Sequence, residues 1–275
     1  MTIRLVAMDL DDTLLRDDWT ISSRTVKAIQ KARAQGVVIT LATGRMAISA
    51  RPYAKQLGLD VPMIAYHGAM IQQVLSGDIL FRRVIPSNIA ADIVQEAAAR
   101  GFHAQIYLKD RVISQQINYW SREYERVASV HVEQGELAML LSQEPEGVEK
   151  ILVMAEETEL EHIANPLKKS FGEKVHITRS KPCYLEIMDI SVNKGVALAA
   201  LAKRLGITRE EIMAIGDSFN DLEMIKYAGL GVAMGNARPE IKEQADLVTV
   251  TNEEDGVAEA IECYVLQEQG QVMAH

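Results

Sequence analysis

Apolar runs and amphipathic stretches alternate along the first part of the chain. Residues 3–9 form a short apolar run that ends in an aspartate, and residues 37–42 form an unbroken, largely β-branched run. Between them, apolar positions recur at helical spacing over residues 26–32, a serine pair precedes them, and Gly36 supplies a stop signal. Short apolar strands separated by helices are typical of a parallel sheet that is covered on both faces.

The same alternation predicts a helix over residues 46–57 and a third strand of the parallel sheet over residues 63–66. It returns late in the chain, where an apolar strand over residues 212–216 precedes a helix over residues 221–227. Ligands of such sheets bind at the carboxyl ends of the strands. Polar residues that directly follow a strand are therefore the candidates for chemistry.

The middle of the chain has a different pattern. Two helices, over residues 88–100 and 159–171, are expected there among several short strands, which suits an α+β module with a partly antiparallel sheet. We therefore predict a Rossmann-like α/β core built from residues 1–84 and 189–275. An α+β domain, residues 85–188, is inserted into it.

The composition of the chain argues against some classes of binding partner. The chain carries 29 Lys and Arg against 38 Asp and Glu, a formal net charge of −9, which argues against a nucleic-acid binder because phosphate neutralisation needs a basic surface. No run approaches the roughly 20 apolar residues of a membrane span, and the first residues lack the apolar core of a signal peptide. Cys183 and Cys263 lie far apart and show no zinc-site spacing. We expect a soluble cytoplasmic protein without nucleic-acid or membrane partners; its oligomeric state is not determined by these features.

Two acidic clusters follow predicted strands. Asp9 and Asp11 are spaced to share one face at the carboxyl end of the first strand, and Asp217 and Asp221 follow the strand over residues 212–216. Crowded carboxylates repel one another unless a cation lies between them, and hard oxygen ligands favour Mg²⁺. The simpler alternatives are a solvated acidic turn for the first cluster and a helix N-cap for the second.

Between these clusters lie two candidate phosphate-binding segments. Thr43, Gly44 and Arg45 follow the second strand and supply a hydroxyl, a backbone N–H and a guanidinium. Asn193 and Lys194 open a predicted helix, where free N–H groups favour anions and the lysine adds a full positive charge.

Taken together and in this order, four segments resemble the motifs of the haloacid dehalogenase-like (HAD) hydrolases: D-L-D-D-T (residues 9–13), L-A-T-G-R (41–45), N-K-G (193–195) and G-D-S-F-N-D (216–221). The large insertion between the second and third motifs is similar to the cap of the Cof-type sugar phosphatases. The chain departs from that pattern at Asp12, where the family usually has glycine, and at His67, where it often has asparagine.

The resemblance implies a phosphatase mechanism. Asp9 would attack phosphorus and form an aspartyl-phosphate, and Asp11 would protonate the leaving alkoxide and then deprotonate water. Mg²⁺ would be held by the Asp9 carboxylate, the Asp11 backbone carbonyl and Asp217, with Asp221 as a further or water-mediated metal contact.

The resemblance also implies phosphate contacts from the following groups: the N–H groups of Leu10 and Gly44, and the side chains of Thr43, Lys194 and Asn220. Arg45, His67 and residues 179–182 are candidate contacts to the rest of the substrate, which is expected to be a small phosphorylated metabolite. Three alternatives stay open: a phosphomutase that uses the same aspartates, a dehalogenase, which would need no Mg²⁺, and a phosphate-sensing module without turnover.

Overall fold

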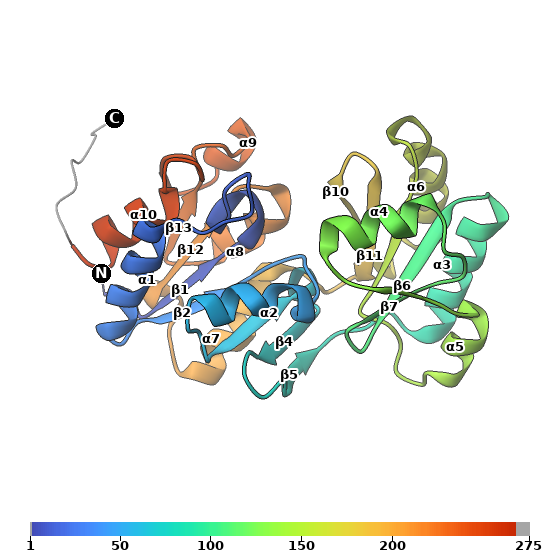
Figure 1. Ribbon diagram of the computed structural model, residues 1–275, viewed down its shortest axis with the longest axis horizontal. Coiled ribbons are helices and arrows are strands. Elements are labelled where there is room, and N and C mark those ends of the chain that lie inside the picture. The colour runs from blue at the N-terminus through green and yellow to red at the C-terminus, as the bar shows by residue number, and fades with distance from the viewer. Residues whose placement is uncertain (1, 268–275) are drawn as a thin grey trace. The chain divides into compact units, whose positions relative to one another are not determined.

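The computed structural model describes residues 2–267 and divides into two compact units (Figure 1). The first unit runs to Leu80 and resumes at Asn193, and the second comprises Phe81–Val192 between these segments. The predicted insertion, residues 85–188, lies within the second unit. Across residues 2–267, no helix has both the length and the hydropathy needed to cross a bilayer.

The first unit is built on a five-stranded, all-parallel sheet with the strand order β14-β13-β12-β1-β2. Its strands and helices are β1 (Leu5–Met8), α1 (Ser23–Ala34), β2 (Val38–Leu41), α2 (Ala47–Gln56), β3 (Pro62–Ala65), β4 (Met70–Gln73), β5 (Ile79–Arg82, which runs on into the second unit), α7 (Lys194–Leu205), β12 (Ile212–Gly216), α8 (Leu222–Tyr227), β13 (Leu230–Ala233), α9 (Pro239–Lys242), β14 (Leu247–Val248) and α10 (Gly256–Tyr264).

The central strands are buried on both faces. Every residue of β1 and of β12 is buried, although successive side chains of a strand point to opposite faces. Helices must therefore cover both sides of the sheet, as the solid apolar runs predicted. Ser22 caps α1 by accepting a hydrogen bond from the Thr25 N–H at 3.0 Å, which confirms the start signal in the sequence.

The third strand is an exception to the prediction. β3 was expected to extend the parallel sheet, but its strand ladder is with β4, in an antiparallel sheet of order β3-β4-β5. Beside β2 it makes an isolated parallel bridge, between Ile64 and Ala42, and the Thr40 hydroxyl donates to the Pro62 carbonyl at 2.7 Å. The reason is the short connection after β3. There Tyr66, His67 and Gly68 have φ values of 52°, 55° and 105°, and these left-handed residues turn the chain straight back along the strand.

The second unit carries a six-stranded sheet with the order β10-β11-β9-β6-β7-β8, in which only the β7–β8 pair is parallel. Its elements are α3 (Ser87–Ala99), β6 (His103–Leu108), β7 (Arg111–Ser114), α4 (Tyr119–Ala128), β8 (Val132–Gln134), α5 (Leu137–Gln143), β9 (Lys150–Met154), α6 (Glu157–Phe171), β10 (Val175–Lys181) and β11 (Tyr184–Asp189). The α/β core with an inserted α+β module is thereby confirmed.

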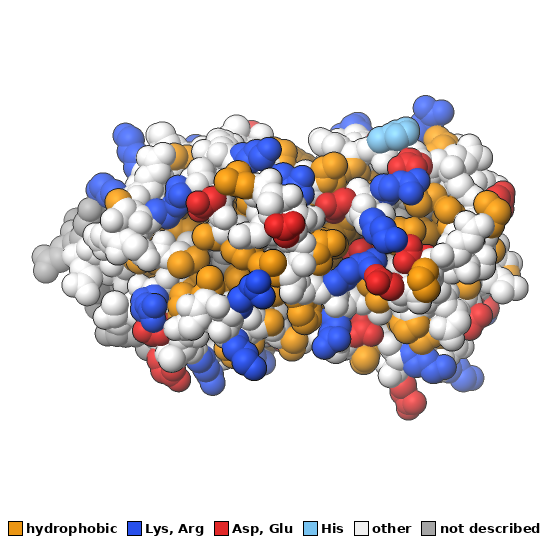
Figure 2. Space-filling view, turned by 90° about the horizontal axis from the view of Figure 1, so that it is seen from below, with side chains coloured by type: hydrophobic (Ala, Val, Ile, Leu, Met, Phe, Trp, Pro, Cys, Tyr) orange, Lys and Arg blue, Asp and Glu red, His pale blue; other side chains and the backbone are white. Residues whose placement is uncertain are grey.

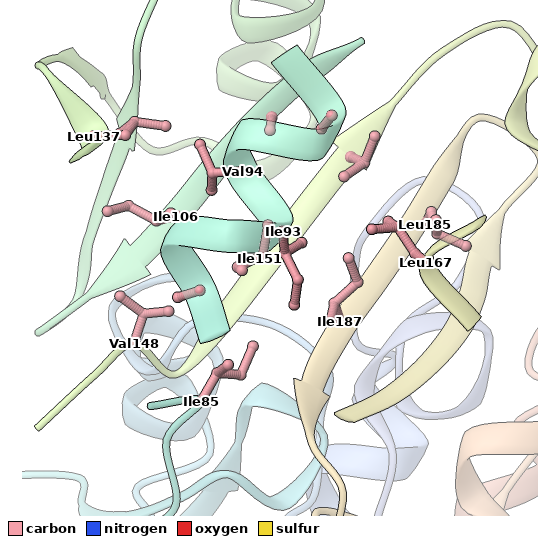
Figure 3. Packing of buried hydrophobic residues seen from close by; sticks show 14 of the residues in the cluster. Ile85, Ile93, Val94, Ile106, Leu137, Val148, Ile151, Leu167, Leu185 and Ile187 are labelled. Carbon is pink, nitrogen blue, oxygen red and sulfur yellow. The ribbon is translucent and has the colours of Figure 1, made fainter. Parts of the chain in front are cut away.

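One face of this second sheet is apolar. Figure 3 shows Ile93 and Val94 of α3 packed over Ile106 of β6 and Ile151 of β9, in a buried cluster that also takes in residues of α5 and α6. The alternate residues of the same strands are also buried, and some of them are polar. Lys150 of β9 is one of them, with its Nζ 3.0 Å from Glu186 Oε2 on β11 and 4.5 Å from the ring centre of Tyr107 on β6.

The second unit contains four helices, where the sequence predicted two. α4 was not predicted because its ten residues are mostly aromatic or charged, and only Ser121 and Tyr124 are buried. Its start is nevertheless marked by a capping box between Asn118 and Ser121, a signal that the sequence does contain. α5 has only seven residues, too few for a periodic pattern to stand out.

Charges of opposite sign are interspersed on the surface. On the face in Figure 2, blue Lys and Arg side chains lie among red Asp and Glu side chains. Several exposed arginines of the second unit pair with glutamates, including Arg100 with Glu96 and Arg126 with Glu123.

Candidate active site

The two acidic clusters lie on neighbouring strands of the first unit. β1 and β12 are paired in parallel, with Met8 opposite Ile215, so both strands end at the same edge of the sheet. The Asp9 N–H donates to the Ile215 carbonyl at 3.0 Å and holds the first residue after β1 against its neighbour. Asp9 and Asp217 therefore leave the sheet side by side, as the strand pattern predicted.

Three carboxylates, those of Asp9, Asp217 and Asp221, meet at this edge and are together called the carboxylate group below. One oxygen from each of Asp9, Asp217 and Asp221 lies within 4.8 Å of the others. Asp221 is fully buried and Asp9 is 5% exposed. Burial, followed by the negative charge of Asp221, raises the pKa of Asp9 well above its usual value and raises that of Asp217 to about 7. Oxygen donors with an uncompensated negative charge suit a hard divalent cation such as Mg²⁺.

Lys194 supplies part of the compensating charge. Its ammonium is fully buried, with Nζ 2.7 Å from Asp9 Oδ1 and 2.6 Å from Asp221 Oδ1. Burial alone would lower the pKa of Lys194, but the carboxylates of Asp221 and Asp9 outweigh this effect and raise it. Lys194 is the first residue of α7, whose N-cap is Asn193, with a side-chain oxygen that accepts from the Val196 N–H at 2.7 Å. The predicted helix opening at Asn193 is confirmed.

Asp221 combines the two alternatives that the sequence left open. Its Oδ2 accepts hydrogen bonds from the backbone N–H groups of Asp217 and Ser218 at 3.1 and 3.0 Å, so it caps the turn before α8. Its Oδ1 binds Lys194 and completes the carboxylate group. The close fit requires glycine at position 216, because a Cβ there would lie 2.5 Å from Asp221 Cβ.

Thr13, for which no role was predicted from the sequence, also belongs to this site. Its hydroxyl donates to Asp217 Oδ1 at 2.7 Å and ties the turn after β1 to the turn after β12. The sequence did contain a signal for this role, because Thr13 is the last residue of the D-L-D-D-T segment. Asp12 in that segment has a φ of 56°, a left-handed conformation that aspartate tolerates better than most residues with a side chain, which explains why it can replace the usual glycine.

Asp11 lies outside the carboxylate group. Its Oδ2 accepts from Arg45 Nε at 2.9 Å and its Oδ1 from Arg45 Nη2 at 2.5 Å, so the two side chains form a bidentate pair. The Asp11 side chain is 47% exposed and that of Arg45 only 13%. The guanidinium predicted to contact the substrate is thus occupied by an aspartate of the same unit.

The other predicted phosphate contacts lie in the turns around this edge. Thr43 is buried, and its Oγ1 accepts from the Arg45 N–H at 3.0 Å. Gly44 lies against His67, since a Cβ at position 44 would be 2.2 Å from His67 Cε1. Asn220 Nδ2 lies 3.3 Å from His67 Nδ1, which joins the turn after β3 to the turn after β12. Leu10, whose N–H was predicted to bind phosphate, has a fully buried side chain.

Residues 179–182, predicted as substrate contacts, belong to the second unit. They cover the end of β10 and the turn that follows it, and Arg179 Nη2 pairs with Glu161 Oε1 at 2.9 Å. The side chain of Ser180 lies outside what the structure describes.

Comparison with known proteins shows the family to which the chain is related. A family model described as haloacid dehalogenase-like hydrolase matches residues 6–261. A 5-amino-6-(5-phospho-D-ribitylamino)uracil phosphatase, YcsE of Bacillus subtilis, is 35% identical over 268 residues, which cover 96% of each chain. An HMP-PP phosphatase of Enterobacter sp. (strain 638) is 30% identical over 246 residues, 86% of each chain.

The fold comparison gives the same result. A crystal structure of a haloacid dehalogenase-like hydrolase from Bacteroides thetaiotaomicron superposes with a TM-score of 0.87 at 31% identity, covering 95% of this chain and 99% of that one. The family model spans nearly the whole chain and includes both halves of the interrupted core. The chain therefore belongs to the haloacid dehalogenase-like hydrolases of the Cof type.

Proposed function

We propose that this HAD-type phosphatase hydrolyses small phosphomonoesters, sugar phosphates or related metabolites, with Mg²⁺ and through an aspartyl-phosphate on Asp9. The observation that carries the proposal is the position of Asp9. It leaves the end of β1 beside Asp217 and Asp221, with the buried Lys194 ammonium 2.7 Å from its Oδ1. A carboxylate held by a cation in a group of oxygen donors suits a nucleophile aimed at an anionic phosphoryl group.

The residues of the chain divide the chemistry between them. An oxygen of Asp9 attacks phosphorus while the bond to the leaving oxygen breaks, and Asp11 delivers a proton to that oxygen. In the second half-reaction Asp11 takes a proton from the water that attacks phosphorus, and Asp9 is released as a carboxylate. Lys194 holds the Asp9 carboxylate in place and adds positive charge beside the phosphoryl oxygens.

The metal site is proposed for the Asp9 and Asp217 carboxylates, with the Asp11 backbone carbonyl as a third ligand. When bound, Mg²⁺ would neutralise phosphoryl charge. Asp221 already caps the turn at Asp217 and binds Lys194, so we assign it to support of the site or to contact through water. Leu10, Thr43, Gly44 and Asn220 are assigned to the phosphate as predicted.

The relatives support a small substrate. One acts, by its name, on 5-amino-6-(5-phospho-D-ribitylamino)uracil and another on HMP-PP. We extend to this chain only the shared class, a small phosphorylated metabolite. Action in the cytoplasm stays a prediction of the sequence.

The test is phosphate release from p-nitrophenyl phosphate and a panel of sugar phosphates, by the wild type and by Asp9→Asn. We expect release that needs Mg²⁺, a phosphorylated Asp9 peptide in rapidly quenched wild-type protein, and neither in Asp9→Asn. Asp60→Asn, at an exposed position of the same unit, is the matched control. Activity of Asp9→Asn equal to that of the wild type, or full activity in EDTA, would exclude this mechanism.

The same assay separates the alternatives. A phosphomutase would convert one phospho-sugar into another without free phosphate, and a sensing module would bind sugar phosphate without consuming it. Release of halide from haloacids without Mg²⁺ would instead identify a dehalogenase.

A further inference from the structure

The bidentate pair between Arg45 and Asp11 is not explained by phosphate binding. A guanidinium that served the phosphate alone would not be paired with a carboxylate, whereas the Nε–Nη2 edge of Arg45 donates to both oxygens of Asp11. The planar fork of arginine matches a carboxylate in a single orientation, so this contact specifies the direction of the Asp11 side chain.

Arg45 itself is held from several sides. Its backbone N–H donates to Thr43 Oγ1 at 3.0 Å, and its carbonyl accepts from the Tyr66 N–H at 2.9 Å. Its guanidinium carbon lies 4.7 Å from the ring centre of Trp19 and 5.4 Å from that of Tyr53. These two aromatic contacts, here called the aromatic clamp, favour a cation and restrict where the guanidinium can lie.

Trp19 lies in a tight turn of the loop after β1. Trp19 has a φ of 66°, which is unfavourable for a bulky side chain, and its N–H donates to the Arg16 carbonyl at 2.8 Å. Asp18 stabilises the same turn by accepting from the Thr20 N–H and hydroxyl at 3.0 and 2.6 Å. Trp19 is 43% exposed, so it adds little to the core, and its ring lies against the Arg45 guanidinium.

We propose that Arg45 is a positioning residue that orients Asp11 for proton transfer, and that the aromatic clamp of Trp19 and Tyr53 fixes the guanidinium for this role. The inference rests on the proposed function, because it assigns Arg45 to the residue that serves as acid and base there. It replaces the sequence-based assignment of Arg45 to the substrate.

The test compares Arg45→Met, Arg45→Lys and Trp19→Ala in the wild-type and Asp11→Asn backgrounds. Leaving-group release in the first turnover is measured with glycerol 2-phosphate, whose alkoxide needs a proton, and with p-nitrophenyl phosphate, whose phenolate does not. We expect Arg45→Met to slow the alkyl substrate by about 100-fold, the scale of a misplaced catalytic group, and the aryl substrate far less. Arg45→Lys and Trp19→Ala should show the same selectivity with a smaller loss.

Two further results are expected. In the Asp11→Asn background, Arg45→Met should cause no additional loss, since Arg45 acts through Asp11. Competitive inhibition by inorganic phosphate should be unchanged in all Arg45 variants. Arg4→Met, which breaks an exposed arginine–glutamate pair of the same unit, is the matched control, and the thermal midpoint of each variant shows whether it folds.

The outcomes distinguish the two proposals. Losses that add in the Asp11→Asn background, or weaker inhibition by phosphate, would overturn the positioning role and return Arg45 to the phosphate. Asp11→Asn with wild-type rates on both substrates, or a wild type that releases no leaving group, would instead refute the proposed function on which the inference depends.

Discussion

Removing one negative charge from the carboxylate group should stabilise the metal-free protein. We consider Asp217→Asn, which keeps an oxygen that can accept the hydrogen bond from Thr13. Burial and the nearby Asp221 charge raise the pKa of Asp217 from its ordinary value of 3.8 to about 7 in the folded chain. Between pH 3.8 and about pH 7, the Asp217 carboxyl therefore keeps its proton in the folded state, whereas in the unfolded state it has already lost it.

The sign and size of the effect follow from this difference. Because the folded pKa is the higher one, stability is lost as pH rises from about 4 to about 7. The shift is roughly three pKa units at about 1.4 kcal/mol each, so the loss is on the order of 4 kcal/mol above pH 7. Asparagine does not ionise, so the variant avoids that loss, which for a unit of this size corresponds to roughly 10 °C in thermal midpoint.

The assay is thermal unfolding in EDTA from pH 4 to pH 8. The midpoint of Asp217→Asn should exceed that of the wild type by an amount that grows with pH and levels off near pH 8, while Asp60→Asn follows the wild type. Millimolar Mg²⁺ should reverse the order at pH 8, because the variant lacks a proposed ligand. Parallel midpoint curves for the wild type and Asp217→Asn in EDTA would refute the electrostatic reasoning.

Three further predictions concern buried contacts. Lys194→Met leaves two buried aspartates without their countercharge and should destabilise the metal-free protein by about 3–5 kcal/mol at pH 7, measured by the same unfolding assay. Lys150→Met should destabilise the second unit by a similar amount, and the added change Glu186→Leu should restore most of it, because a packed apolar pair replaces the ion pair without burying an unpaired charge. Gly44→Ala places a Cβ 2.2 Å from His67 Cε1 and should lower both the thermal midpoint and phosphate release, with overpacking of roughly 1–3 kcal/mol.

Each of these predictions has a result that contradicts it. A Lys194→Met protein as stable as the wild type at pH 7 would mean that Asp9 and Asp221 can be hydrated or protonated in the folded state at no cost in free energy. If Lys150→Met and its double variant lose equal stability, the buried pair is not the source of the loss. An unchanged Gly44→Ala protein would show that the buried histidine moves aside freely. Arg4→Met, at an exposed pair, gives the baseline for all three.

The sequence by itself determined the strand ends and the order of the motifs. Parallel strands in the middle of a covered sheet leave apolar runs, and Asp9 and Asp217 follow two such runs directly. The cap of α7 at Asn193 was predictable for the same reason, since it depends on residues that are near each other in the chain. Local signals of this kind were sufficient to predict the α/β class, the insertion and the two strand ends at which Asp9 and Asp217 lie, whereas Asp11, predicted beside Asp9, lies outside the group of three carboxylates.

Contacts between distant segments were decided only by the tertiary structure. β3 was predicted as a strand, but its partner depended on the turn that follows it and not on its own apolar residues. Asp221 suited a cap or a site residue equally well in sequence, and only its place beside Lys194 made it both.

Arg45 is the clearest case of the same limit. Its positive charge and its position after a strand predicted that it binds an anion. The sequence could not show whether that anion is a substrate phosphate or the carboxylate of Asp11, 34 positions earlier in the chain. The answer depends on the distances between side chains of separate turns. These distances are set by the folded sheet and cannot be predicted from a local sequence pattern. The sequence thus identified which residues could do chemistry, and the three-dimensional packing decided which of them are partners of one another.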